Sequence, residues 1–416
     1  MLERLLLDVD REVGRILDAA LDGRELTIPE AARLLVADGA DLLALVRAAD
    51  VARVADVGDD VSFVVNRNIN FTNICYVGCS FCGFSRHSDD ADAYDRSLEE
   101  ILDKVRDAVA RGATEVCIQG GIHPQKDHTH YRDILVAIKR RFPAIHIHAY
   151  SPEEIDFGHR KSGMKLGDYL LWLRDHGLDT IPGTAAEILD DSIRQIVSPR
   201  KLGRERWVEI VSAAHRVGIR SSSTVMYGHI EKPEHLAEHF GLLRDIQKRT
   251  GGFTEFVPLG FIHEKNSLYA HMGARGGSSM AEDLRVLAVA RLFLRPWITN
   301  VQVSWVKMGP KLATLGLLAG ANDFGGTLME ESISRESGAG FGENLAPETI
   351  RALIRGAGRV PVERSTTYAI LRRFDDPALD PPSLEPDAAQ TLAGPGRMRA
   401  GAKLTRLERP SSAASA

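Results

Sequence analysis

The 416-residue chain has little of several features that define whole classes of protein. It contains only four cysteines, and 52 lysines and arginines against 57 acidic residues leave a net charge of -5. No run of about 18 or more apolar residues occurs, as a membrane-spanning helix would need. Acidic residues and arginines interrupt the first residues, where a signal peptide would have an apolar core. Because a basic surface is also missing, we expect a cytoplasmic protein without membrane or nucleic-acid partners.

The composition, 44% hydrophobic and 26% charged, is that of an ordinary globular protein. Apolar positions recur about every three to four residues in 1–58, which predicts an N-terminal helical extension. In 59–374, short apolar or β-branched runs alternate with longer amphipathic stretches, as in βα units. The proline-rich segment 375–416 has few aromatic or β-branched residues, which predicts a disordered tail.

The candidate strands of the central segment fix the expected fold class, which is α/β. They are residues 62–71, 114–120, 145–151, 179–184, 220–228, 254–262, 300–307 and 322–328. Eight strands separated by helices predict a complete (β/α)8 barrel of the TIM type. In such a barrel the loops that follow the strands form the catalytic face.

Three of the four cysteines are concentrated in one short segment. Cys75, Cys79 and Cys82 directly follow the first candidate strand, and clustered cysteines without an export signal indicate metal binding rather than disulfides. Iron–sulfur clusters usually take four thiolates, so three would leave one iron open. The alternatives are a buried thiol cluster and a zinc site, which would need a further ligand such as His87. Cys117 lies in an apolar strand, and we expect it to be a small buried hydrophobe.

The spacing C-x3-C-x-aromatic-C, with Phe81 before Cys82, resembles the radical S-adenosylmethionine (SAM) superfamily. The resemblance implies a TIM-like radical SAM barrel in which Cys75, Cys79 and Cys82 hold a 4Fe-4S cluster. It further implies that SAM binds the open iron. The cluster, reduced by an external electron donor, then cleaves SAM to a 5'-deoxyadenosyl radical that abstracts a hydrogen atom.

Four further residues are candidates for binding SAM. Gly120 and Gly121 end the second strand, and the corresponding glycines of the superfamily contact the methionyl amino group. Here Ile122 replaces the acidic residue that usually follows them. Ser151 ends the third strand, and Glu187 follows the fourth, where the superfamily often has a polar residue near SAM. The alternatives are a glycine turn with positive φ and a glutamate in the first turn of a helix.

Longer segments, including CIQGGIHP, DTIPGTAAEIL, RSSSTVMYGHIE and GANDFGGTLMEESIS, resemble the 4-hydroxyphenyl transferase family of deazaflavin biosynthesis (CofH, or the C-terminal half of FbiC). The resemblance implies transfer of the 4-hydroxybenzyl group of L-tyrosine to C5 of 5-amino-6-(D-ribitylamino)uracil, with 2-iminoacetate, 5'-deoxyadenosine and methionine released. It also implies a CofG-type cyclase as functional partner. The alternatives are two menaquinone-pathway enzymes, aminofutalosine synthase and dehypoxanthine futalosine cyclase, or a non-catalytic iron or zinc clamp.

Catalytic candidates come from two strand ends. His146 and His148 alternate along one strand and therefore point to one face, where they could meet substrate or simply form a polar layer of the barrel. Glu330 and Glu331 follow the eighth strand and could hold the tyrosine ammonium or the uracil edge. Solvated acids at a helix start are the alternative. The hydroxyl-rich run 221–224 suggests a polar pocket for ribityl hydroxyls.

Overall fold

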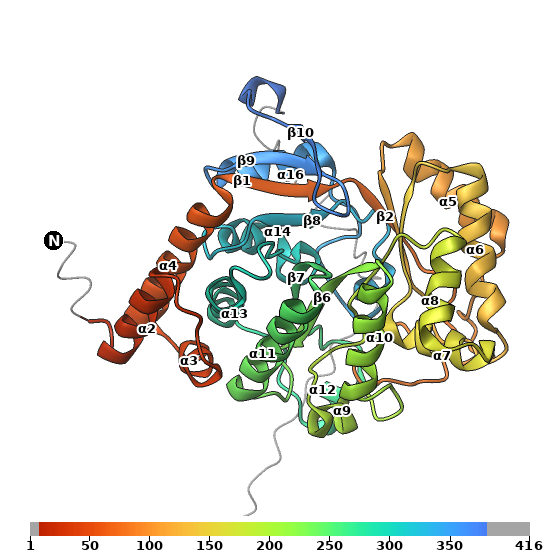
Figure 1. The fold of residues 1–416 in the computed structure, drawn as a ribbon, viewed down its shortest axis with the longest axis horizontal. Coiled ribbons are helices and arrows are strands. Elements are labelled where there is room, and N and C mark those ends of the chain that lie inside the picture. The colour runs from red at the N-terminus through yellow and green to blue at the C-terminus, as the bar shows by residue number, and fades with distance from the viewer. Residues whose placement is uncertain (1–7, 381–416) are drawn as a thin grey trace, which may run out of the picture.

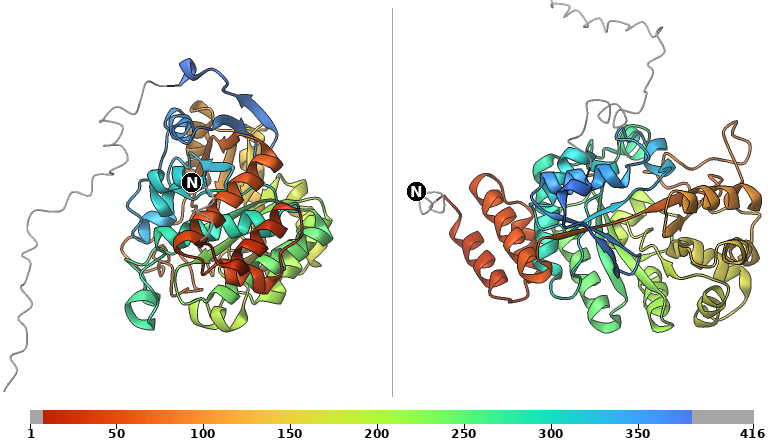
Figure 2. Two further views of the ribbon diagram at one scale, coloured as in Figure 1. Left: turned by 90° about the vertical axis from the view of Figure 1, so that its left-hand side faces the viewer. Right: turned by 90° about the horizontal axis from the view of Figure 1, so that it is seen from above.

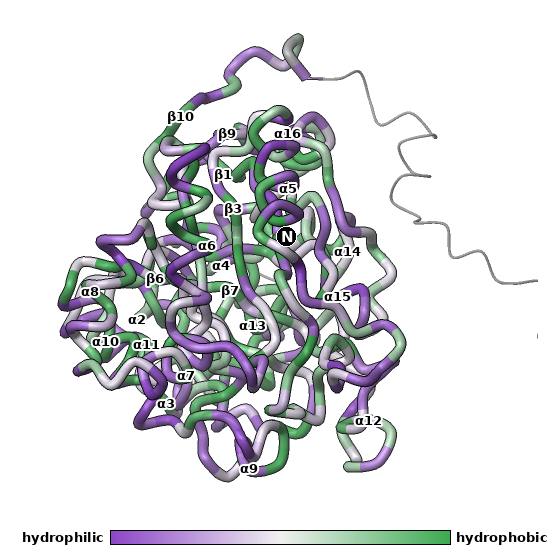
Figure 3. Tube along the Cα trace, turned by 90° about the vertical axis from the view of Figure 1, so that its right-hand side faces the viewer, coloured by the Kyte–Doolittle hydropathy of each residue, from purple (hydrophilic) through white to green (hydrophobic). Residues whose placement is uncertain are grey.

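The computed structural model describes residues 8–380 of the chain. Its centre is a parallel sheet curled into a half-barrel, with helices packed around the outside (Figure 1). The N-terminal helices lie at one end of the molecule, as the view from above shows most clearly (Figure 2). Hydrophobic and hydrophilic stretches alternate along the outer helices (Figure 3), as expected for helices with one face on a core.

Six parallel strands form the larger sheet, and each pairs with the next along the chain. They are β2 (Asn66–Ile69), β3 (Glu115–Ile118), β4 (His146–Ala149), β5 (Thr180–Ile181), β6 (Arg220–Tyr227) and β7 (Phe253–Gly260). The helices between them are α5 (Leu98–Ala110), α6 (His128–Arg141), α7 (Pro152–Ser162), α8 (Leu166–Asp175), α9 (Asp191–Val197), α10 (Arg204–Arg216) and α11 (Pro233–Thr250). This βα alternation is the one that the sequence predicts.

The smaller sheet has the order β10–β9–β1–β8. Its strands are β1 (Asp60–Val64), β8 (Asp323–Gly326), β9 (Val360–Arg364) and β10 (Ile370–Arg373). The predicted first strand therefore divides at Val65 into β1 and β2, which belong to different sheets. Strands β9 and β10 were not predicted.

The predicted strand at 300–307 is wrong. Only two single bridges form there, Phe256 with Val301 and Gln302 with Asp323, and they connect β7 to β8. The helix α14 (Trp305–Gly316) begins before a full strand can extend. The strands β7 and β8 are therefore joined at this point by single bridges only, and the sheet curls into the half-barrel of an α/β fold.

Three helices precede the sheets: α2 (Arg11–Leu21), α3 (Ile28–Leu34) and α4 (Gly39–Val57). They pack against α11 and the buried helix α13 (Met280–Leu294). Helices α3, α5 and α7 each begin with a capping box, in which a hydroxyl and a glutamate bond each other's backbone N–H groups. No helix in residues 8–380 is long and apolar enough to cross a membrane.

The remaining elements follow β7 and β8. They are α12 (Ser267–Met272), α15 (Ser332–Glu336), α16 (Pro347–Gly356) and a 3-10 helix (Pro377–Leu379). The first residues of the predicted tail, 375–380, are part of this fold. Arg351 and Arg355 of α16 form ion pairs with Asp380 at 2.9 and 2.8 Å. The rest of the predicted tail, 381–416, lies outside the described residues.

Candidate active site

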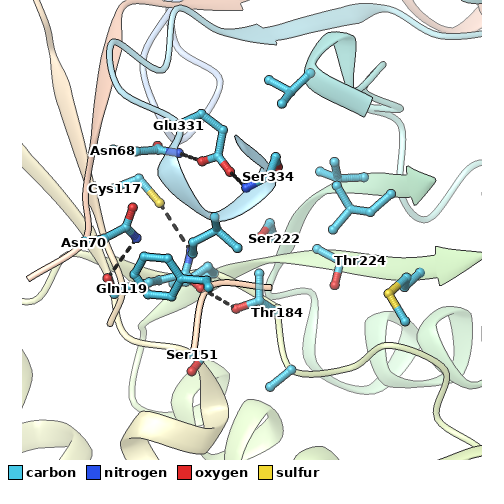
Figure 4. Close-up of a pocket in the computed structure, with 18 of the residues that line it drawn as sticks. Asn68, Asn70, Cys117, Gln119, Ser151, Thr184, Ser222, Thr224, Glu331 and Ser334 are labelled. Atoms are coloured by element: carbon cyan, nitrogen blue, oxygen red, sulfur yellow. Dashed lines mark hydrogen bonds between the residues drawn. The ribbon is translucent and has the colours of Figure 1, made fainter. Parts of the chain in front are cut away.

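One cavity of about 420 Å3 lies at the carboxyl ends of the strands. Cys75, Cys79 and Cys82 all line it, together with polar side chains from β2, β3, β4, β6, β7 and β9. Figure 4 shows part of this lining, in which Asn68, Cys117 and Thr224 and their labelled neighbours converge on a common space. The cysteine loop therefore lies over the catalytic face, as expected.

Backbone hydrogen bonds hold the cysteine loop in place. The N–H of Cys75 donates to the carbonyl of Arg86 at 3.0 Å, and that of Cys82 donates to Cys79 at 3.1 Å. Ser80 is bound on both sides: its N–H donates to Val197, and its carbonyl accepts from Leu268. None of these bonds uses a cysteine side chain, so the thiols are free to bind a ligand.

The surroundings of the thiols suit thiolate ligands of a metal cluster. Burial raises the pKa of Cys79 to about 12 and also raises that of Cys82, so the thiolates need a positive charge to form. N–H groups of Phe84 and Ser85 donate to the Cys82 sulfur, a contact that tunes iron–sulfur clusters. In the described chain no three His, Cys, Asp or Glu side chains surround one point for a single metal ion. Three thiols on one loop that lines the cavity are the donor set that an iron–sulfur cluster with one open iron would use.

The fourth cysteine, Cys117, lies on β3 and lines the same cavity. Gln119 Nε2 donates to its sulfur at 3.6 Å, and burial raises its pKa. It belongs to the cavity wall rather than to the hydrophobic core that we expected.

Gly120 and Gly121 are required for close packing around the cysteine loop. Neither has positive φ, so the alternative of a strained glycine turn is wrong. A Cβ on Gly121 would lie 2.3 Å from the carbonyl oxygen of Ile74 and 3.0 Å from Cβ of Cys75. One on Gly120 would lie 2.6 Å from the ring of Phe71. The two glycines let β3 lie directly against the start of the cysteine loop.

We expect Gly121→Ala to displace Cys75, because the added methyl group meets backbone atoms that cannot rotate away. Overpacking of this kind typically costs about 1–3 kcal/mol, and iron content after reconstitution should fall together with thermal stability. Gly14→Ala is the matched control, since a Cβ at Gly14 in α2 meets nothing within 4 Å. Full iron content in Gly121→Ala would contradict this account of the glycine.

Ser151 lines the cavity and caps α7. Its hydroxyl donates to Glu154 Oε2 at 2.7 Å, and Glu154 Oε1 accepts from the N–H of Gly120 at 3.0 Å. Burial raises the pKa of Glu154 to about 7, although these hydrogen bonds oppose the rise. Glu154 thus connects the end of β4 to the glycines after β3.

Glu187 also lines the cavity, and it lies in a loop rather than in the first turn of a helix. Helix α9 begins only at Asp191, so that alternative is wrong. Its carboxylate forms ion pairs with Lys201 at 2.6 Å and with Arg194 at 3.2 Å. Burial alone would raise the pKa of Glu187, but the two cations outweigh it and lower the pKa.

His146 and His148 share one hydrogen-bond partner. The His146 Nε2 and His148 Nδ1 atoms lie 2.8 and 2.7 Å from Thr180 Oγ1. Burial lowers the pKa of both residues, that of His148 to about 4, so His148 is neutral near pH 7. Of the two, His148 lines the cavity and His146 does not.

The two glutamates after β8 lie in different places. Glu331 lines the cavity, whereas Glu330 turns toward Arg67 and Lys104, with ion pairs of 2.6 and 2.7 Å. The structure therefore brings Glu331 to the cysteines and leaves Glu330 outside the cavity.

The hydroxyl-rich strand β6 divides its side chains between two environments. Ser222 and Thr224 line the cavity, and both bond Gly183, whose N–H donates to Ser222 at 3.0 Å. Ser221 and Ser223 are fully buried and bond His215 and the Glu255 carbonyl instead.

Several cavity residues were missed by sequence reasoning. Asn66 and Asn68 of β2 and Asn70 directly after it occupy alternate positions and line the cavity, a spacing that could have indicated a polar wall. Lys307 and Arg364 also line it. They come from α14 and β9, elements that were not predicted, so no local signal placed them there.

Two family models match the chain. Residues 69–243 match the model described as Radical SAM superfamily, and residues 250–376 match the CofH/MqnC C-terminal region. The 5-amino-6-(D-ribitylamino)uracil--L-tyrosine 4-hydroxyphenyl transferase of Methanothermobacter thermautotrophicus is 46% identical over 362 residues, which is 87% of this chain and 98% of that protein.

A second group of relatives is much longer. The FO synthase of Mycobacterium tuberculosis is 52% identical over 338 residues, which is 81% of this chain and 40% of that protein. The chain therefore spans about 40% of the length of the FO synthases that it matches.

Solved structures support the same fold at low sequence identity. Methylornithine synthase (PylB) is 19% identical, with a TM-score of 0.66 over 83% of this chain and 97% of that one. The hydrogenase maturase HydG is 16% identical, with a TM-score of 0.67 over 87% of this chain and 77% of that one. The two family models and the match over 98% of the Methanothermobacter transferase agree. The chain belongs to the radical SAM family of 5-amino-6-(D-ribitylamino)uracil--L-tyrosine 4-hydroxyphenyl transferases.

Proposed function

We propose that the chain joins the 4-hydroxybenzyl group of L-tyrosine to C5 of 5-amino-6-(D-ribitylamino)uracil. The observation that carries the proposal is the shared cavity, in which the three cysteines face a wall of polar side chains suited to a hydroxyl-rich substrate. The match over 98% of the archaeal transferase supports this choice of substrates.

Cys75, Cys79 and Cys82 would hold the 4Fe-4S cluster, and we propose that Gly120, Gly121, Ser151 and Glu187 line the place of SAM. When bound, the cluster and SAM supply the one-electron chemistry that starts the radical reaction. The chain's own residues bind and orient the substrates and exclude water. His148, neutral near pH 7, and the Ser222 and Thr224 hydroxyls offer hydrogen-bonding groups to the uracil or its ribityl chain.

The reaction needs further participants. An external electron donor must reduce the cluster, and we propose a CofG-type cyclase as the functional partner that uses the product. We also propose a cytoplasmic location, because unpaired thiols of a metal site persist where cysteines stay reduced.

The test is a substrate-omission assay on protein reconstituted anaerobically with iron and sulfide. With a reductant, SAM, tyrosine and the diaminouracil, we expect the 4-hydroxybenzyl adduct by mass spectrometry. Omission of either substrate should abolish it. The same mixture offered only the substrates of the menaquinone enzymes should give no product.

Two results would count against the proposal. If 5'-deoxyadenosine forms but no adduct does, the enzyme acts on substrates other than tyrosine and the diaminouracil. The match to the CofH/MqnC region makes the menaquinone enzymes the next candidates. An intact cluster that never yields 5'-deoxyadenosine would contradict the radical reaction itself.

A further inference from the structure

Three cationic side chains line the main cavity, and they differ in how their charge is balanced. Lys201 forms an ion pair with Glu187 at 2.6 Å, and Arg364 forms one with Asp323 at 2.5 Å. Lys307 Nζ donates to the hydroxyl of Ser334 at 2.7 Å. Within residues 8–380 no carboxylate lies within 4.0 Å of it. A cavity-facing lysine with no carboxylate within ion-pair distance favours an anionic ligand.

Glu331 provides the opposite charge close by but is kept from pairing with Lys307. One of its oxygens accepts from the Asn68 amide, and the other accepts from the N–H of Ser334 at 2.7 Å. Ser334 therefore bonds Glu331 through its backbone and Lys307 through its hydroxyl. Lys307, Ser334 and Glu331 all line the same cavity.

We infer that Lys307 and Glu331 hold the head group of an α-amino acid, Lys307 its carboxylate and Glu331 its ammonium group. Charge-assisted hydrogen bonds of this kind are among the strongest available to a ligand. If the proposed function is correct, on which the inference rests, the amino acid is L-tyrosine. The methionyl part of SAM carries the same head group and is the other source to be tested.

The surroundings of Lys307 favour tyrosine. Lys307 also lines a second cavity of about 250 Å3 that shares Gly260, Phe261 and Ile262 with the first. Phe261, Met308, Leu312 and Phe341 contribute apolar side chains to this second cavity, which polar side chains such as His263 and Ser278 also line. A head group held at Lys307 could therefore place an aromatic ring against apolar side chains, as ligand pockets typically do.

The test measures binding of four ligands to the reconstituted holoenzyme by equilibrium dialysis. They are SAM, L-tyrosine, tyramine, which lacks the carboxylate, and 3-(4-hydroxyphenyl)propionate, which lacks the ammonium group. The wild type should bind tyrosine about 100-fold more tightly than tyramine, since an unpaired buried charge costs several kcal/mol. Lys307→Met should lower tyrosine affinity about 100-fold and bind tyrosine and tyramine alike, with SAM affinity unchanged.

Two further variants sharpen the test. Glu331→Gln should instead remove the preference for tyrosine over 3-(4-hydroxyphenyl)propionate, and it stands in if Lys307→Met does not fold. Lys104→Met is the matched control, because Lys104 pairs with Glu330 outside the cavity, and its tyrosine affinity should equal that of the wild type.

Each outcome has a defined meaning. Wild-type tyrosine affinity and selectivity in Lys307→Met would overturn the inference but leave the proposed function standing. Weakened SAM binding with normal tyrosine binding would overturn it in favour of the methionyl group. A wild-type holoenzyme that binds no tyrosine would overturn the proposed function, and the inference with it.

Discussion

Cys79→Ala is expected to abolish cluster assembly and to lower adduct formation by more than about 100-fold. Changing a residue that only supports a metal ligand already lowers metal affinity or activity by about 10–100-fold, and loss of the ligand itself should lower it further. The fold should survive, since backbone hydrogen bonds hold the cysteine loop without the thiol. The reconstituted variant should lack the broad visible absorption of an iron–sulfur cluster and keep the circular dichroism of the wild type.

Cys117→Ala is the matched control for that experiment. Cys117 lines the same cavity and is also a free thiol, but it lies on β3 outside the C-x3-C-x2-C loop. It should keep both absorption and turnover. Wild-type turnover in Cys79→Ala would refute the cluster assignment, and loss of the cluster in Cys117→Ala would make the fourth cysteine a ligand.

Features that are encoded over a few neighbouring residues could be predicted from the sequence. The spacing of Cys75, Cys79 and Cys82, together with a loop position after a strand, is visible over a few residues, and so is the alternation of short strands with amphipathic helices. His148, Glu187 and Glu331 could be placed near the cavity because parallel strands present their carboxyl ends at one edge.

Other parts of the site depend on contacts that no local pattern contains. Residues 300–307 have the β-branched alternation of a strand, yet α14 begins at Trp305. Val360–Arg364 includes a proline, which weakens the signal for a strand, yet β9 pairs with β1. The cavity-lining Lys307 and Arg364 come from these two misjudged segments.

Arg364 comes from the unpredicted strand β9 and is buried against two carboxylates. We expect Arg364→Met to lower the free energy of unfolding by about 3–5 kcal/mol, because the variant leaves these buried carboxylates without their cation. Its Nε lies 2.5 Å from Asp323 and its Nη2 lies 3.3 Å from Glu255. The side chains of Arg364 and Asp323 are 3% and 0% exposed. Denaturant midpoints at equal cluster loading would measure the change.

The loss of stability in Arg364→Met should also depend on pH and be larger above pH 7 than below it. Burial raises the pKa of Glu255 to about 7, and the Arg364 guanidinium opposes that rise. Without the guanidinium the pKa of Glu255 rises further, so the folded state loses more stability above pH 7, where the wild-type carboxyl ionises, than at lower pH. Arg373→Met is the control, because its pair with Asp60 is 44% and 33% exposed and should contribute at most about 1 kcal/mol. Equal, small losses in both variants would mean that the Arg364 network contributes no more than a surface pair.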